Sequence, residues 1–427
     1  MSKTESFLAD LVNIVGDKAC TTDEQALEPH VTEWRNVLHG RALAMVSPGT
    51  TEEVADIVRL CSRDGIAIVP QGGNTGLCGG AIPDESGQQL ILSLARLNRI
   101  RSVDAQDFSM VAEAGCVLAT LQEEARAAGR YFPLSLSAEG SCQIGGNLAT
   151  NAGGINVIRY GTARQQVLGL EVVLADGSIV DGLRSLHKDT AGYDLKHLFI
   201  GSEGTLGIIT AATLRLYPDP GETTTLLLTL PDSGSAVTLL AGLRAVLDDR
   251  IESFELISDY ALQLVERQIA DAAIPCEISG DWFVLAEVVV DEESASLGRF
   301  LEDAFEDGQV LDAVIAKNLA EADRFWRARH AISEAQKHEG PSIKHDISVP
   351  VGHMREFLLR CAEKLREQEP SAKPVIFGHV GDGNLHYNLT VPDELAGDAD
   401  RVARITTTIY DLVAELGGSF SAEHGVG

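Results

Sequence analysis

Two histidines flank a Gly-Asp-Gly turn in the segment FGHVGDGNLHYN at residues 377–388, and the sequence ends in SAEHGVG. These motifs supply His379, His386, Glu423 and His424. Two histidines on strands that face each other across a tight turn can reach one ion. Together with a carboxylate they form a ligand set typical of Zn²⁺ or a similar divalent metal, with positions left open for a substrate. A hydrogen-bonded buried histidine is the alternative, but five of the eleven histidines lie between residues 345 and 424, which favours a metal site.

A second cluster of functional side chains lies in FWRARHAISEAQKHEGPSIKHDISVP at 325–350. Arg329 and Ser333 are four residues apart, so they share one face of the expected helix. Lys344, Asp346 and Ser348 alternate along an expected strand and point to the same side. An arginine and a lysine placed in this way can bind a carboxylate distant from the reacting carbon. An ordinary salt-bridged helix surface is the alternative.

Glycine is concentrated in four segments of the first half, PQGGNTGLCGG (70–80), IGGNLATNAGG (144–154), the Tyr-Gly pair at 160–161 and GSEGTLGIIT (201–210). Glycine lets backbone N–H groups crowd around an anion without a Cβ in the way. A single glycine turn is usually only a turn, but four within about 140 residues favour a nucleotide cofactor. The chain contains no G-x-G-x-x-G after a strand and no G-x-x-x-x-G-K-[ST], so a fold other than the Rossmann or P-loop type should bind it.

Composition narrows the function classes. The chain has 427 residues, 44% of them apolar, and a net charge of -29, which disfavours a nucleic-acid surface. The seven cysteines are scattered without a C-x-x-C pair, as is usual for reduced thiols. No apolar run approaches the length of a transmembrane segment, and the first residues resemble an amphipathic helix rather than a signal peptide. We therefore expect a soluble cytoplasmic protein, with the mature mitochondrial matrix as the alternative compartment.

The elements that must position these residues follow two patterns. In the first half, a helix should begin near Thr51 and end at Gly65, and Asp176-Gly177 should form a hairpin turn. Strands are expected there at 43–47, 66–69, 90–94, 111–114 and 168–174. The proline- and glycine-rich Tyr217–Gly221 marks a domain boundary, which divides the chain into residues 1–219 and 220–427.

The second half alternates strands with longer helices. Strands are expected at 223–230, 253–257, 282–290 and 343–349, and helices at 235–248, 258–269, 292–305, 320–337 and 352–367. This order is typical of an α+β domain in which helices cover a mostly antiparallel sheet.

The glycine-rich half, from about residue 40 to 217, resembles the FAD-binding domain of the vanillyl-alcohol-oxidase/para-cresol-methylhydroxylase flavoproteins. The resemblance implies a two-part FAD-binding domain in residues 1–219. The loop without histidine favours non-covalent FAD, because many relatives attach the flavin through a histidine there. The implied diphosphate loop consists of Pro70, Gly72, Gly73, Asn74, Thr75 and Gly76. The implied flavin and ribityl contacts are Pro133, Ser135, Ser141, Gly145, Gly146, Asn147 and Thr150, with Gly204 and Ile209 at the adenine end.

The motifs of the second half resemble those of D-2-hydroxyglutarate dehydrogenases, so that the resemblance covers nearly the whole chain. It implies that Arg329, Ser333 and Lys344 bind the distal substrate carboxylate and that Asn388 assists. It implies that the metal, Zn²⁺ or another divalent ion, is bound by His379, His386 and Glu423 and holds the substrate, with His424 as general base. The product would be a 2-oxo acid. Electron-transfer flavoprotein or a quinone would accept the electrons, and a homodimer is an open alternative.

Two departures from the family pattern bear on these expectations. The pattern continues some tens of residues beyond EHGVG, and this C-terminal segment is absent after residue 427, so either the sequence is incomplete or flavin binding is weaker. His330 stands where many relatives have glutamate, a feature shared with D-lactate dehydrogenase-like members. D-malate and D-lactate are therefore alternative substrates. An O₂-using oxidase, a metal-dependent hydrolase without flavin and a non-catalytic flavoprotein are alternative functions.

Overall fold

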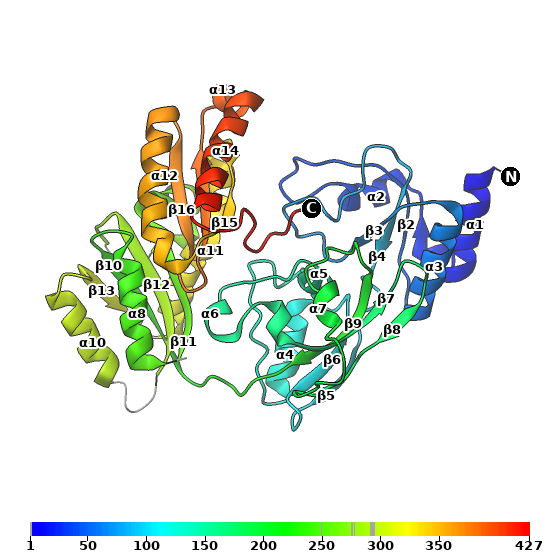
Figure 1. Cartoon of the computed structure of the whole chain (residues 1–427), viewed down its shortest axis with the longest axis horizontal. Coiled ribbons are helices and arrows are strands. Elements are labelled where there is room, and N and C mark those ends of the chain that lie inside the picture. The colour runs from blue at the N-terminus through cyan, green and yellow to red at the C-terminus, as the bar shows by residue number, and fades with distance from the viewer. Residues whose placement is uncertain (1, 249, 275, 277, 291–294) are drawn as a thin grey trace. The chain divides into compact units, whose positions relative to one another are not determined.

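The structure is a computed structural model that describes residues 2–248, 250–274, 276, 278–290 and 295–427 (Figure 1). Its contacts divide the chain into two compact units. The first unit contains Met1–Gly154, Tyr160–Asp219 and Glu423–Gly427, and the second contains Ile155–Arg159 and Pro220–Ala422. The main change of unit falls between Asp219 and Pro220, and each unit has its own hydrophobic core.

The first unit begins with a four-stranded sheet in the order β1-β2-β4-β3, in which β2, β3 and β4 run parallel. Its strands are β1 (Cys20–Thr21), β2 (Ala42–Val46), β3 (Ile68–Gln71) and β4 (Gln89–Ser93). The flanking helices are α1 (Lys3–Val15), α2 (Glu24–Val31) and α3 (Thr51–Asp64). The N–H of Glu53 donates to the Thr50 hydroxyl, and α3 ends at Gly65 in the left-handed conformation (φ 71°), so both ends of α3 are capped.

A five-stranded antiparallel sheet, in the order β5-β6-β9-β7-β8, completes this unit. Its strands are β5 (Ile100–Asp104), β6 (Ser109–Glu113), β7 (Val167–Val173), β8 (Ile179–Asp181) and β9 (Ile208–Arg215). Strands β7 and β8 form the hairpin expected at Asp176-Gly177, where Gly177 takes φ 78°. Helix α4 (Leu118–Ala127) packs its apolar face into the core beside this sheet, and α5 (Ile144–Ala149) also contributes to that core.

The second unit is built on an eight-stranded antiparallel sheet in the order β13-β10-β12-β11-β16-β17-β14, with β15 also paired to β17. The strands are β10 (Thr223–Leu230), β11 (Ile251–Ser258), β12 (Trp282–Val289), β13 (Asp312–Ile315), β14 (Ser342–Ile343), β15 (Asp346–Ser348), β16 (Lys373–His379) and β17 (Asn384–Thr390). The α+β class and the antiparallel sheet covered by helices, both expected from the sequence, are confirmed.

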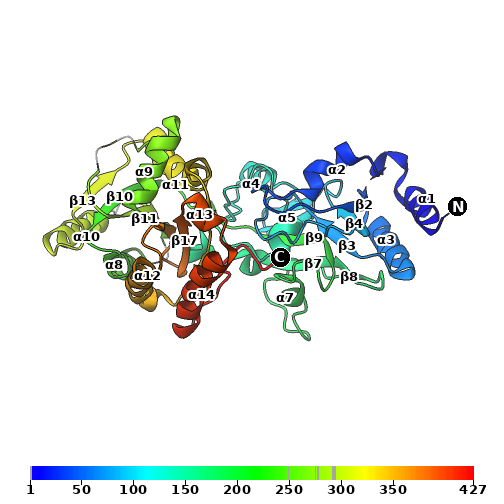
Figure 2. The same cartoon turned by 90° about the horizontal axis from the view of Figure 1, so that it is seen from above.

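Helices cover both faces of this sheet, as Figure 2 shows, with α9 and α11 on one side of the strands and α8, α12 and α14 on the other. The first face is formed by α9 (Asp259–Gln268) and α11 (Leu319–Glu339). The second is formed by α8 (Ser235–Leu247), α10 (Ala295–Glu306), α12 (Met354–Gln368) and α14 (Ala399–Glu415). The remaining short helices are α6 (Val157–Tyr160), α7 (Lys196–Phe199) and α13 (Asp393–Ala396), with 3₁₀ turns at Asp17–Ala19, Ala163–Gln166, Ala270–Ala272 and Val351–His353.

One expectation from the sequence is wrong, and part of another falls outside the described residues. The strand expected at 343–349 is wrong as a continuous element, because it is interrupted between β14 and β15 at Lys344 and His345. The N–H of His345 donates to the side chain of Asn388 (3.1 Å) instead of to a backbone carbonyl, which breaks the ladder. The start of the helix expected at 292–305 falls on residues 292–294, which lie outside the described residues; α10 is described from Ala295.

Among the helices of the described residues, none combines the length and the apolar character that crossing a membrane requires.

Candidate functional site

A pocket of the first unit is lined by the glycine-rich segments. Twelve of the predicted cofactor residues line it, namely Pro70, Gly72, Gly73, Asn74, Thr75, Gly76, Gly145, Gly146, Asn147, Thr150, Gly204 and Ile209. The predicted general base, His424, lines the same pocket. Pro70 and Gly204, which are 134 residues apart in the sequence, therefore line the same pocket. They approach each other closely, since a Cβ added to Gly204 would lie 3.1 Å from the ring of Pro70.

The other three predicted contacts, Pro133, Ser135 and Ser141, are not among the described residues that line this pocket. Ser135 donates its hydroxyl to Glu139 (3.4 Å). The sequence reasoning did not single out Gln71, Gln143 or Glu203, which the structure adds to the lining. The position of Gln71 at the end of β3, directly before the double glycine, was the signal that could have identified it.

Side-chain hydrogen bonds from Gln71 and Asn74 hold the diphosphate loop in place. Gln71 is fully buried and donates to the carbonyl oxygens of His30 (2.8 Å) and Ala81 (2.9 Å). Asn74, in the left-handed conformation with φ 51°, donates to the carbonyl oxygens of Pro29 (3.1 Å) and Thr32 (3.0 Å). These bonds tie the loop to the end of α2 and to the carbonyl group of Ala81.

Glycine is required where this loop meets the segment before α5. A Cβ on Gly73 would lie 2.3 Å from the carbonyl oxygen of Ser141, and one on Gly145 would lie 2.6 Å from the Cβ of Ala114. Within the described part of the chain, the side-chain oxygens of Gln143 and Asn147 are buried without a hydrogen-bond partner, and both residues line the pocket. Unpartnered buried acceptors next to close-packed glycine backbone fit a polar ligand such as the predicted FAD.

The substitution Gly73→Ala should release the cofactor. Its Cβ meets a backbone oxygen that cannot move aside, so we expect FAD affinity to fall about 10- to 100-fold, equivalent to roughly 1.4–2.7 kcal/mol. The ratio of flavin to protein absorbance after gel filtration measures this loss. The matched control is Gly140→Ala, whose Cβ would have no neighbour within 4 Å; equal flavin retention in both variants would contradict the prediction.

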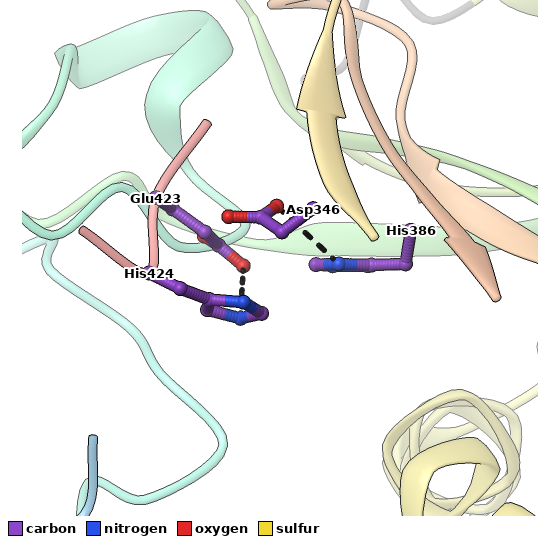
Figure 3. Close-up of side chains that lie close together, drawn as sticks. All are labelled: Asp346, His386, Glu423 and His424. Atoms are coloured by element: carbon purple, nitrogen blue, oxygen red, sulfur yellow. Dashed lines mark ion pairs between the residues drawn. The ribbon is translucent and has the colours of Figure 1, made fainter. Parts of the chain in front are cut away.

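The C-terminal tail of the chain, residues 423–427, belongs to the same unit and carries two predicted site residues. Glu203 accepts the backbone N–H groups of Val426 and Gly427, both at 2.9 Å. Glu423 accepts the N–H of Gly154 (3.2 Å), and its other oxygen lies 3.7 Å from Nε2 of His424 (Figure 3). The tail thereby holds His424 at the pocket that is lined by the glycine segments.

The two histidines of the Gly-Asp-Gly motif lie in the second unit, on the neighbouring antiparallel strands β16 and β17. Phe377 pairs with His386, so His379 and His386 share one face of the sheet, and their ring centres are 5.7 Å apart. Both side chains are almost fully buried. The prediction that the turn brings the two rings together is consistent with this geometry.

Each histidine has a carboxylate at its Nδ1 atom. Nδ1 of His379 is hydrogen-bonded to Glu255, and Nδ1 of His386 lies 3.5 Å from Asp346, a pair drawn in Figure 3. Asp346 is held in turn by Asn384, whose Nδ2 donates to it at 2.8 Å. A carboxylate at Nδ1 keeps the proton on that nitrogen and leaves Nε2 as the lone-pair donor, which is the usual arrangement behind a metal-binding histidine. The donor set therefore fits a divalent ion.

Glu255 also binds the predicted substrate residue Arg329. Nε and Nη2 of Arg329 approach one oxygen of Glu255 at 2.8 and 2.6 Å. Burial alone would raise the pKa of Glu255, but the charge of Arg329 and the hydrogen bonds from Arg329 and His379 hold that pKa well below its usual value. Glu255 is thus a buried carboxylate anion, and the sequence reasoning missed it because it lies on a strand without any motif.

The remaining predicted substrate residues surround this cluster in the second unit. Ser333 lies one turn after Arg329 on α11, and Lys344 is half-buried in the break between β14 and β15. Asn388 donates to Gln336 (2.9 Å) and accepts the N–H of His345, so its amide is oriented from both ends. Whether these residues bind a substrate stays a prediction.

Both parts of the chain match known protein families. Residues 42–182 match the model described as FAD binding domain, and residues 219–427 match the model described as FAD linked oxidases, C-terminal domain. The first match covers the glycine segments at 70–80 and 144–154, and the second covers the histidine motifs.

Curated relatives match over almost the whole chain. A D-2-hydroxyglutarate dehydrogenase of Xanthomonas citri pv. viticola is 40% identical over 99% of this chain and 89% of its own length. The mitochondrial D-2-hydroxyglutarate dehydrogenase of Bos taurus is 38% identical over 99% of this chain and 77% of its own length. A probable mitochondrial D-2-hydroxyglutarate dehydrogenase of Oryza sativa subsp. japonica is 39% identical over 97% of this chain and 74% of its own length.

Solved structures share the fold at much lower identity. A p-cresol methylhydroxylase with bound substrate superposes with a TM-score of 0.76 at 16% identity, covering 98% of this chain and 89% of that one. An alkyldihydroxyacetonephosphate synthase superposes with a TM-score of 0.75 at 17% identity, covering 97% of this chain and 81% of that one. The fold expected from the glycine segments is confirmed. Together with the curated relatives, these findings show that the chain belongs to the FAD-linked oxidoreductase family that includes the D-2-hydroxyglutarate dehydrogenases.

Proposed function

We propose that this protein oxidises D-2-hydroxyglutarate to 2-oxoglutarate with non-covalent FAD and a divalent metal ion, Zn²⁺ or a similar one. The observation that carries the proposal is the cluster of the second unit, where two histidines backed by carboxylates lie beside a buried arginine. Such a cluster can hold an ion and a dicarboxylate together. The names of the curated relatives support the same substrate.

The proposed metal ligands are His379, His386 and Glu423. The histidines are supported by their shared sheet face and by the carboxylates at Nδ1. Glu423 is supported by chain continuity, because the N–H of Ala422 donates to the carbonyl oxygen of Asp346 (3.1 Å) and Glu423 is the next residue. Two imidazoles and one carboxylate suit Zn²⁺ and leave room for a bound substrate.

Bound FAD supplies the acceptor for the two electrons and the hydrogen removed from C2, and the divalent ion makes the C2 hydroxyl more acidic. The residues of the chain do the rest. Arg329 presents a guanidinium that, with Ser333 and Lys344, binds the distal carboxylate and orients the substrate. Asn388 assists this binding, and His424 accepts the hydroxyl proton as general base.

The identity of the acid is tested by anaerobic flavin bleaching with D- and L-enantiomers of 2-hydroxyglutarate, malate and lactate, each with and without a chelator. We expect D-2-hydroxyglutarate to bleach the flavin fastest and the chelator to prevent bleaching. A preference for D-lactate would support the alternative raised by His330. Electron-transfer flavoprotein or a quinone as acceptor, a cytoplasmic location and a homodimer stay predictions.

The substitution Arg329→Lys should separate dicarboxylate from monocarboxylate substrates. Lysine keeps the positive charge beside Glu255 but cannot form the two-pronged contact of a guanidinium. We expect KM for D-2-hydroxyglutarate to rise about 10- to 100-fold, corresponding to loss of a charged hydrogen bond of roughly 1.5–3 kcal/mol, with little change for D-lactate. The matched control is Arg327→Lys, on the exposed side of the same helix. Equal losses for both acids would contradict the assigned role of Arg329.

A further inference from the structure

We propose that Glu255 is a positioning residue that holds a metal-ligand histidine and the substrate-binding arginine at the same time. This inference rests on the proposed function, since it gives the buried carboxylate a role in the metal and substrate sites. All three residues belong to the second unit, so the geometry that carries the proposal lies within one compact part of the chain.

Strand pairing places Glu255 directly beside His379. In the antiparallel pair of β11 and β16, Glu255 is the register partner of His379, so the two side chains project from the same face of the sheet at neighbouring positions. Helix α11 packs across that face and brings in Arg329. The side chain of Glu255 is fully buried, with an exposed fraction of 0%, and water therefore does not compete for its oxygens.

The two oxygens of Glu255 have different partners. Oε1 accepts from Nδ1 of His379, while Oε2 accepts from Nε and Nη2 of Arg329. The first contact keeps the His379 proton on Nδ1, which leaves Nε2 available to an ion. The second contact uses Nε and Nη2 of the guanidinium. One carboxylate thus sets the tautomer of a ligand and the orientation of a substrate-binding group.

Arg329 is held from a second direction by an aromatic ring. Its Cζ atom lies 4.7 Å from the ring centre of Phe377, which also contacts the ring of His386 at 4.7 Å between centres. Arginine, phenylalanine and the two histidines are therefore packed into one buried group around Glu255. Asp346, behind the other histidine, is held by Asn384.

Glu255→Gln tests the proposal because an amide has only one acceptor oxygen. The charged Arg329 should take that oxygen, which turns the NH₂ group towards His379 and forces its proton to Nε2. The readout is Zn²⁺ affinity of the chelator-treated, FAD-loaded protein, measured by competition with a chromogenic chelator. We expect the affinity to fall about 10- to 100-fold, as for other residues that orient metal-binding histidines.

A double variant provides the rescue. When Glu255→Gln is combined with Arg329→Met, no donor competes for the amide oxygen, which can accept from Nδ1 of His379 again. We expect Zn²⁺ affinity to return to within about threefold of wild type, while the double variant loses selectivity for the dicarboxylate because it lacks the Arg329 guanidinium. The double variant also removes both charges of the buried pair, so it remains folded if the single variant does not.

Glu287→Gln is the matched control, because Glu287 is a half-buried carboxylate of the neighbouring strand β12 and accepts a hydrogen bond from the Thr223 hydroxyl (3.0 Å). It should leave Zn²⁺ affinity unchanged. If wild type binds no stoichiometric Zn²⁺, the proposed metal site itself is wrong. If wild type binds Zn²⁺, three results would overturn the role of Glu255 while the metal site stands. They are an unchanged Zn²⁺ affinity in Glu255→Gln, an equal loss of Zn²⁺ affinity in Glu287→Gln, and no recovery of Zn²⁺ affinity in the double variant.

Discussion

Replacing His424 by alanine should nearly abolish flavin bleaching by D-2-hydroxyglutarate while FAD and metal stay bound. His424 lines the pocket of the first unit and follows Glu423 at the proposed metal site. Without it, no positioned side chain accepts the hydroxyl proton, and general-base catalysis typically contributes about 10²- to 10⁴-fold in rate. The bleaching rate under single-turnover conditions, measured by stopped flow, should therefore fall by that factor.

Free imidazole distinguishes a base from a structural residue. Added imidazole should restore part of the rate in His424→Ala, because it can occupy the vacated space and accept a proton. His187→Ala, at an exposed histidine of the same unit, should bleach at the wild-type rate. An unchanged bleaching rate in His424→Ala would rule out the assignment, and so would a loss that is fully explained by missing flavin.

Replacing His386 by alanine should remove the metal and with it the activity. The variant retains one imidazole and one carboxylate of the proposed set, too few for tight binding of Zn²⁺. Because substitutions of residues that only orient a ligand already cost about 10- to 100-fold in metal affinity, loss of a ligand should cost more. We expect metal analysis of the purified variant to show less than stoichiometric Zn²⁺ and the bleaching rate to fall to that of chelated wild type.

His338→Ala, on the exposed side of α11, is the control for this experiment and should keep both metal and rate. Flavin content should be unchanged in both variants, because the pocket lies in the other unit. Full metal content in His386→Ala would exclude this histidine as a ligand. Wild-type bleaching after complete removal of metal would show that the ion is not needed for the reaction.

Local sequence patterns predicted most elements of the fold. The expected strand at 223–230 coincides with β10, and the expected helix at 320–337 lies inside α11. These elements follow from apolar periodicity and from caps such as Asn318, whose side chain accepts the N–H of Glu321. The strand at 343–349 could not be predicted correctly, because its interruption depends on the side chain of Asn388, which lies 43 residues from His345.

The residues of the candidate site divide in the same way, into those that a local sequence motif indicates and those that only tertiary contacts reveal. The glycine segments and the Gly-Asp-Gly histidines could be singled out from the sequence because the functions proposed for them require particular residue types at short spacing. Glu255 was not visible, since a glutamate in an apolar strand resembles many others until its partners are known. Asp346 was noted only as part of an alternating strand, and its place behind His386 depends on the pairing of β15 with β17.

The two histidines, Glu423 and His424, with which the sequence analysis began, were proposed as site residues from the sequence alone, as were the glycine segments that indicated FAD. Their chemistry is local, so it survives in a linear motif. Tertiary structure decided what holds them. Glu255 is 124 residues from His379 and 74 from Arg329 along the chain. The register of β11 with β16 and the packing of α11 bring Glu255, His379 and Arg329 together. Each of these polar groups is buried and therefore needs a partner, and no local sequence pattern specifies which partner that is.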